Sequence, residues 1–126
     1  MPSSFKMTRR VVFSETDAAG IVHFANFFRW MEEAEHAFLR SLGTSVHQQD
    51  SSGLRGFARV GASCEYQSPL KFEDEFAVVL SVLEKKAKSL TYGFSFEVSG
   101  IDKPIATGEM TVVCITRPND ADRMRA

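Results

Sequence analysis

The feature that most restricts the fold is one long helical period followed by a series of strand periods. Apolar residues recur at steps of three and four from Phe27 to Leu42, the spacing that places them on one face of an α-helix. Asn26 is a candidate N-cap, and Gly43 follows as a candidate stop. The pattern predicts an amphipathic helix of about 16 residues, about 24 Å long.

Beyond this helix the apolar period changes to two, which is the period of a half-buried β-strand. Apolar and polar residues alternate in this way from Arg59 to Tyr66, and the alternation ends at Pro69. Further strands are predicted at 75–84, 89–99 and 104–116, and one precedes the helix at 6–13. Residues 44–56 are polar, contain Gly and Ser, and are predicted to form a connecting loop.

The connections after Pro69 are too short to contain crossover helices, so the strands must pair antiparallel. About five such strands present an apolar face that only the long helix can cover. The predicted fold class is therefore α+β, an antiparallel sheet wrapped around one helix. A single domain is predicted over 1–126, with 117–126 forming a frayed tail.

Composition argues against several classes of partner. Fifteen basic and 16 acidic residues give a net charge of −1, which does not favour nucleic acid or anionic lipid. No apolar run reaches the ~20 residues of a membrane span, and the N-terminus lacks the apolar core of a signal peptide, so a cytosolic protein is expected. Cys64 and Cys114 lack paired spacing and are expected to be inert buried thiols. No histidines stand at ligand spacing, so no metal is expected.

The segment SETDAAGIVHFANFF, residues 14–28, joins the first strand to the helix. Asp17 is its candidate chemical group, because a carboxylate can attack a carbonyl or take a proton from water. The alternative is that Asp17 only caps the loop. First-turn N–H groups of a helix lack intrahelical acceptors and suit an oxyanion, and the candidate donors are Phe24 and Ala25. Gly20 would let backbone and substrate approach closely, while His23 is a candidate acid–base group, pocket wall or structural residue.

Two segments together carry a resemblance to a known family. TDAAGIVHFANFFRWMEEAEHAFL, residues 16–39, and YQSPLKFEDEF, residues 66–76, resemble the hotdog-fold acyl-CoA thioesterases, in particular the 4-hydroxybenzoyl-CoA thioesterase family. The likeness covers roughly residues 6–117. It implies a helix held in a curved antiparallel sheet, protomers paired edge to edge into a dimer or tetramer, and active sites at the protomer interface.

The resemblance also implies roles for particular residues. Asp17 takes the position of the catalytic carboxylate, and the N–H of Phe24 takes that of the donor that polarises the thioester carbonyl. CoA phosphates would bind at the turn between the third and fourth strands, where Lys85, Lys86 and Lys88 lie. The alternative is that these lysines form a solvated hairpin tip. No cofactor is implied, because the CoA thioester is itself the substrate.

The sequence departs from each branch of the family at the helix start. The branch linked to the Tol-Pal envelope system has Tyr and His where this chain has His23 and Phe24. The aromatic-acyl branch has two aromatics and a Pro at 23–25, and 1,4-dihydroxy-2-naphthoyl-CoA thioesterase has an aromatic at 24 with no Pro after it. An aromatic acyl group is therefore one option among several.

A second hotdog branch uses a glutamate of the helix for catalysis and lacks the loop Asp. Glu32, Glu33 and Glu35 are the corresponding candidates, and the alternative is that they are solvated or pair subunits. Glu35 stands apart because it falls near the edge of the apolar stripe.

The function predicted from the sequence is hydrolysis of an acyl-CoA thioester to free acid and CoA. Two alternatives remain open. A hydratase acting on enoyl thioesters is expected to pair an Asp with a His about five residues later, which the six-residue step from Asp17 to His23 loosely permits. A non-catalytic module that binds acyl thioesters is the other.

Overall fold

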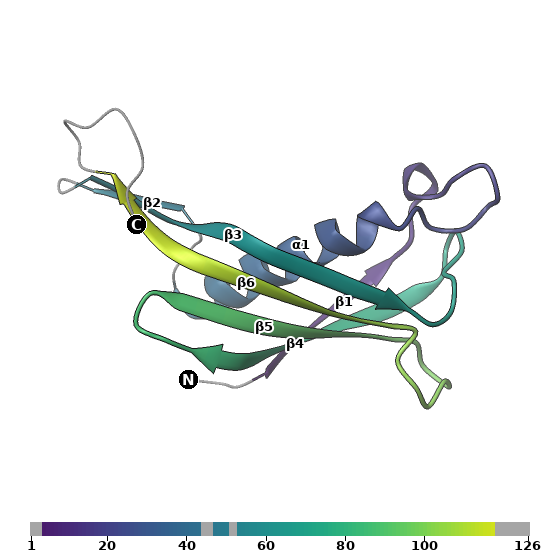
Figure 1. Cartoon of the computed structure of the whole chain (residues 1–126). Helices are drawn as coiled ribbons and strands as arrows, with labels where there is room; N and C mark the ends of the chain where they lie inside the picture. Colours follow the sequence, from purple (N-terminus) through teal and green to yellow (C-terminus); the bar gives the residue numbers. More distant parts are fainter. Residues whose placement is uncertain (1–3, 44–46, 51–52, 118–126) are drawn as a thin grey trace.

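The computed structural model describes residues 4–43, 47–50 and 53–117. In this part of the chain, one helix, α1 (Ala25–Ser41), lies against one face of a curved six-stranded sheet (Figure 1). A 3₁₀ turn, η1 (Phe13–Glu15), precedes the loop that leads into the helix. The strands are β1 (Ser4–Arg10), β2 (His47–Asp50), β3 (Gly53–Tyr66), β4 (Glu75–Lys85), β5 (Ser89–Glu97) and β6 (Ala106–Arg117).

The strands lie in the order β1-β4-β5-β6-β3-β2, and every neighbouring pair is antiparallel. The predicted fold class is therefore confirmed. Five strands correspond to the predicted ones, and the additional β2 pairs with the start of β3 inside the segment predicted to be a loop. Residues 44–46 and 51–52 of the predicted loop lie outside the described residues, as do residues 118–126 of the predicted tail.

The core lies between α1 and the sheet and is rich in aromatic rings. The ring centroid of Trp30 lies 4.5 Å from that of Phe76, and the ring of Phe27 lies 5.0 Å from that of Phe96. All four side chains are buried, and aromatic pairs at such distances add to the free energy of apolar burial. The apolar stripe predicted for the helix is thus confirmed as its core-facing side.

Met31 of helix α1 packs closely against Gly108 of β6. A Cβ at this position would lie 2.7 Å from Sδ of Met31 and 2.9 Å from the carbonyl oxygen of Ser63. Both distances are shorter than packed atoms allow, so glycine is required for this helix–strand contact.

Strand β3 contains a bulge between Arg59 and Gly61. A bulge adds one residue to one strand and shifts the alternation of its side chains. Val60 is consequently 62% exposed, while Arg59 points toward the helix and forms an ion pair with Glu35. The strict alternation predicted from Arg59 to Tyr66 was therefore wrong at the start of this segment. Beyond Gly56, β3 pairs only with β6 among the described strands, which leaves its other edge open.

Two further expectations concern the cysteines and the membrane. Cys64 and Cys114 are free thiols, but both are half-buried and not fully buried as expected. No helix in the described ranges is long and apolar enough to cross a membrane.

Candidate active site

The loop between η1 and α1 is a narrow turn closed by main-chain bonds. Thr16 and Val22 form an antiparallel bridge, and the N–H of Asp17 donates to the carbonyl oxygen of Ile21 at 2.8 Å. Gly20 donates to the carbonyl oxygen of Asp17 at 3.0 Å with a φ of +84°, which residues with a Cβ rarely adopt. A Cβ at Gly20 would meet none of the described atoms within 4 Å. Backbone conformation therefore explains this glycine, not crowding within the chain.

The carboxylate of Asp17 is exposed at the tip of this turn. Its Oδ1 accepts a hydrogen bond from the N–H of Ala19 at 2.8 Å, which is the geometry of a loop cap. Its Oδ2 accepts no hydrogen bond from the described residues. The capping role considered for Asp17 thus occupies one oxygen and leaves the second available for chemistry.

The start of α1 leaves one predicted N–H donor unoccupied. The N–H of His23 donates to the carbonyl oxygen of Glu15 at 2.9 Å, and that of Phe27 donates to Phe24 at 3.2 Å. Ala25 donates to Nδ1 of His23 at 3.2 Å. The N–H of Phe24 has no acceptor within the described part of the chain. Of the two predicted oxyanion donors, Phe24 is therefore free and Ala25 is occupied.

The imidazole of His23 supports the helix start. Its Nδ1 accepts the hydrogen bond from Ala25, and its ring stacks on Phe24 with centroids 4.7 Å apart. A nitrogen that accepts from a backbone N–H is unprotonated, so the other ring nitrogen carries the proton of the neutral form. These contacts favour a structural role among the alternatives considered for His23.

An apolar cleft of about 310 Å³ adjoins the helix start. Its aromatic wall consists of Phe24, Phe27 and Tyr66, and the hydroxyl of Tyr66 donates to the carbonyl oxygen of Phe24 at 3.3 Å. Burial, together with the neighbouring Cys64 thiol, raises the pKa of Tyr66 to about 12, so the hydroxyl remains a donor at neutral pH. The remaining lining residues are Ile21, Val22, Gln67, Ser68, Pro69 and Leu70.

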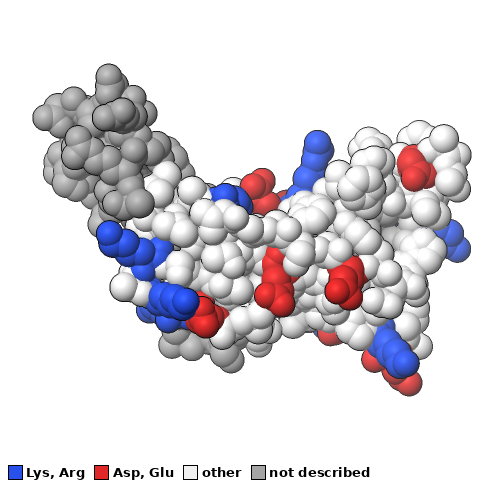
Figure 2. Space-filling model, viewed as in Figure 1, with Lys and Arg blue, Asp and Glu red and all other residues white. Residues whose placement is uncertain are grey.

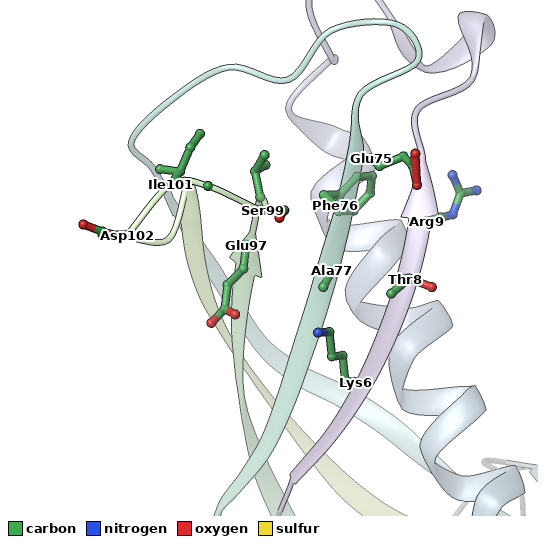
Figure 3. A pocket seen from close by; sticks show the side chains of 12 residues that line it. Lys6, Thr8, Arg9, Glu75, Phe76, Ala77, Glu97, Ser99, Ile101 and Asp102 are labelled. Atoms are coloured by element: carbon green, nitrogen blue, oxygen red, sulfur yellow. The ribbon is translucent and has the colours of Figure 1, made fainter.

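A larger cavity, of about 480 Å³, lies elsewhere and contains none of the predicted site residues (Figure 3). Thr8, Ala77 and Glu97 are paired in register across β1, β4 and β5. Because Phe76 packs on the helix, its neighbour Ala77 faces the opposite side of the sheet. This cavity therefore lies on the outer face of the sheet, away from the loop that carries Asp17.

The predicted CoA-binding lysines lie at the other end of the molecule from Asp17. Helix α1 has 17 residues, a length of about 25 Å. Lys85, Lys86 and Lys88 line a pocket with Leu39 and Leu42 at the helix C-terminus, and Figure 2 shows basic side chains gathered at this end. Lys86 also contacts Glu84 at 3.3 Å. One protomer does not bring the lysines and Asp17 together.

The helix glutamates are occupied by contacts within the protomer. Glu33 pairs with Arg9 at 2.8 Å, and Glu32 lies 3.5 Å from Arg59. Glu35 is fully buried and forms an ion pair with Arg59. Burial raises the pKa of Glu35, and the charge of Arg59 partly opposes this effect. The proposed subunit pairing or solvation of Glu35 was therefore wrong. Among the described residues, no cluster of three His, Cys, Asp or Glu could hold a metal.

The structure also reveals residues near the site that sequence reasoning missed, namely Glu15, Asn26 and Tyr66. The expected N-cap position belongs to Phe24, and Asn26 lies in the first helical turn. The side-chain amide of Asn26 donates to the carbonyl oxygen of Glu15 at 2.9 Å. Tyr66 begins the second family segment and was a detectable candidate. Glu15 gave no local signal, because strand β1 and helix α1 bury it.

Comparisons with known proteins show what the sequence and the fold of this chain are similar to. Residues 11–123 match the family model of the thioesterase-like superfamily. A 4-hydroxybenzoyl-CoA thioesterase from Pseudomonas sp. strain CBS-3 is 24% identical over 134 positions, which cover 100% of this chain and 92% of that protein. The structure of a gentisyl-coenzyme A thioesterase is 32% identical with a TM-score of 0.78, covering 92% of this chain and 96% of that one. A hypothetical protein from Aquifex aeolicus is 31% identical with a TM-score of 0.80, covering 91% and 89%.

Proposed function

Because the chain belongs to the thioesterase-like superfamily, we propose that it hydrolyses an acyl-CoA thioester to the free acid and CoA. The family match and the likeness to a solved thioesterase confirm the predicted class of enzyme, a thioester hydrolase with a hotdog fold. One observation carries the proposed mechanism: the same short loop presents a carboxylate oxygen of Asp17 and the N–H of Phe24, both without a partner among the described residues.

Asp17 acts on the thioester in one of two ways. Its free oxygen attacks the carbonyl carbon, which releases CoA and leaves a mixed anhydride that water hydrolyses. In the second route it takes a proton from water, and the water oxygen attacks instead. In both routes negative charge develops on the carbonyl oxygen. The N–H of Phe24, at the positive end of α1, stabilises this charge. The reaction needs no metal or cofactor.

The aromatic cleft favours a planar, aromatic acyl group. Phe24, Phe27 and Tyr66 supply ring faces and edges on its walls, and aromatic ligands gain from such contacts beyond the area they bury. The relatives named for 4-hydroxybenzoyl-CoA and gentisyl-coenzyme A support the same class of substrate. We therefore expect a hydroxylated aromatic acyl-CoA ester to be the best substrate.

A two-fold oligomer would complete the site. The open edge of β3 carries the small residues Gly61, Ala62 and Ser63, all exposed, and such an edge can pair with another strand. The edge of β1 is less suited, because it carries exposed Lys6 and Arg10. Antiparallel pairing of two β3 edges around a two-fold axis would reverse the partner's helix. The lysine hairpin of the partner would then lie at the end where Asp17 is.

We propose a dimer of this kind as the minimal active unit, with a tetramer formed from two such dimers. The site would combine the Asp17 loop of one protomer with the lysines of the other. A cytosolic location fits both a CoA thioester substrate and the free thiols of Cys64 and Cys114.

The decisive experiment measures thiol release from a panel of CoA esters with benzoyl, hydroxybenzoyl, gentisyl, dihydroxynaphthoyl, short-chain and long-chain acyl groups. Asp17→Asn keeps the oxygen that accepts from Ala19 and should lower kcat at least ~10²-fold with an unchanged circular dichroism spectrum. Full activity in this variant would reduce Asp17 to a loop cap. Water addition to crotonyl-CoA would instead indicate a hydratase, and binding without turnover would indicate a binding module.

A further inference from the structure

Glu15 is a buried carboxylate two residues before Asp17, and the mechanism above does not use it. Its side chain is only 11% exposed. Its Oε1 accepts from the N–H of Val12 at 2.9 Å, and its Oε2 accepts from the indole N–H of Trp30 at 3.0 Å. Arg9 lies within 3.1 Å of Oε1 and 3.0 Å of Oε2. A carboxylate with this many donors is held in one orientation.

Two of the donors come from other elements, β1 and α1, and the third lies at the start of the turn that contains Glu15, so Glu15 joins this turn to both elements. Arg9 belongs to β1, Val12 adjoins η1, and Trp30 is a fully buried residue of α1. Arg9 is itself fixed, because it pairs with Glu33 at 2.8 Å and lies 5.7 Å over the ring of Trp30. The carboxylate of Glu15 is thus anchored to the body of the fold.

The main chain of Glu15 extends this anchor to the site. Its carbonyl oxygen accepts from the N–H of His23 at 2.9 Å and from the side-chain amide of Asn26 at 2.9 Å. His23 directly precedes Phe24, whose N–H is the proposed oxyanion donor. On the other side, only Thr16 separates Glu15 from Asp17. One residue therefore connects both groups of the proposed site to the same buried anchor.

We propose that Glu15 is a positioning residue that fixes the carboxylate of Asp17 relative to the N–H of Phe24. The inference rests on the proposed function of those two residues. A displacement of reacting groups by about 1 Å can cost up to 10²-fold in rate, so loosening this anchor should act on the chemical step. Substrate binding, which depends on the cleft and the lysines, should change little.

The variant Glu15→Gln retains the shape of the side chain and removes the charge that holds Arg9 and Trp30 together. We expect kcat to fall by about 10- to 100-fold while KM changes less than about 3-fold. The matched control is Glu75→Gln, which removes the exposed carboxylate that pairs with the neighbouring Arg10 at 2.9 Å. Among the described residues no hydrogen bond or ion pair joins Glu75 to Glu15 or Arg9, so this variant should keep kcat within about 2-fold.

A double variant separates positioning from mere structural support. In an Asp17→Asn background, Glu15→Gln should lower kcat little further, because there is no catalytic carboxylate left to position. Equal fold-losses in both backgrounds would overturn the inference, as would wild-type kcat in Glu15→Gln. If Glu15→Gln fails to fold, Trp30→Phe removes one donor to the same carboxylate and should give a kcat loss in the same direction.

Amide hydrogen exchange provides a readout that does not depend on turnover. In Glu15→Gln, exchange at His23, whose N–H donates to the carbonyl oxygen of Glu15, should accelerate at least ~10-fold relative to wild type and to Glu75→Gln, while exchange in β5 stays the same. Unchanged exchange would overturn the positioning role. If wild type hydrolyses no ester but exchange accelerates as expected, the proposed function fails and the anchoring by Glu15 stands.

Discussion

Replacing Arg59 by methionine should destabilise the protein at neutral pH and much less under mildly acidic conditions. Arg59 provides the ion-pair partner of Glu35, whose side chain has no exposed surface. The other oxygen of Glu35 has no hydrogen-bond partner among the described residues. Without Arg59, the carboxylate would be buried without a compensating charge, and folding would require it to take up a proton.

The magnitude follows from the cost of this protonation. The ordinary pKa of a glutamate is 4.5, about 2.5 units below pH 7, and each unit corresponds to about 1.4 kcal/mol. Arg59→Met should therefore lose up to about 3.4 kcal/mol at pH 7 from this source, but only about 0.7 kcal/mol at pH 5. Burial raises the pKa of Glu35 in the folded state, so its contribution to stability is present at low pH and lost as pH rises.

Urea unfolding at pH 5 and pH 7, at fixed protein concentration, would measure this difference. The single tryptophan of the chain, Trp30, is fully buried and provides the fluorescence signal. Loss of the hydrogen bond from Arg59 to the carbonyl of Phe57 adds a cost that does not vary with pH. In the double variant Glu35→Gln/Arg59→Met, the pH-dependent part of the lost stability should disappear, because residue 35 no longer carries a carboxyl group that titrates. The other titratable groups near this position, Glu32, His36 and Tyr92, are unchanged. A deficit for Arg59→Met that is equal at both pH values would refute the reasoning.

At the site, Phe24→Pro should remove the proposed oxyanion donor and keep the φ of this residue, which is −57°, a value that proline also adopts. We expect kcat to fall by about 10²- to 10³-fold. The control Phe24→Leu keeps the N–H, so its kcat should fall far less. Comparable kcat values in the two variants would exclude the N–H of Phe24 as the oxyanion donor. Replacing Lys85, Lys86 and Lys88 together by glutamine should raise KM for CoA esters about 10-fold, with little change in kcat and a weaker dependence on ionic strength. An unchanged KM would mean that the hairpin is a solvated tip.

The elements with a clear apolar period could be predicted from the sequence. The helix stripe and the long strands depend on local alternation, which a single chain displays directly. Strand β2 could not be found, because its residues His47–Asp50 are all polar and show no apolar alternation. The bulge at Arg59 was also hidden, since the alternation of residue types does not reveal that Arg59 contacts Glu35, 24 residues earlier.

The candidate site divides in the same way. Asp17, Gly20 and Phe24 belong to one continuous loop and helix start, so their proximity follows from the chain itself. The positions of the buried acids, in contrast, do not follow from the chain itself. Glu15 depends on Trp30 of α1 and on Arg9 of β1, and no spacing in the sequence distinguishes it from an exposed loop acid. Long-range packing creates such residues, and only the folded structure identifies them.

The separation of Asp17 from the lysine hairpin by the length of α1 has a consequence for hybrid enzymes. In the proposed dimer each site takes its carboxylate from one chain and its phosphate-binding lysines from the other. A chain that lacks Asp17 and a chain that lacks the lysines would each form an impaired homodimer. Mixed together, they would form heterodimers in which one site carries both defects and the other carries neither. Two defective alleles could then restore up to half of the wild-type sites per heterodimer.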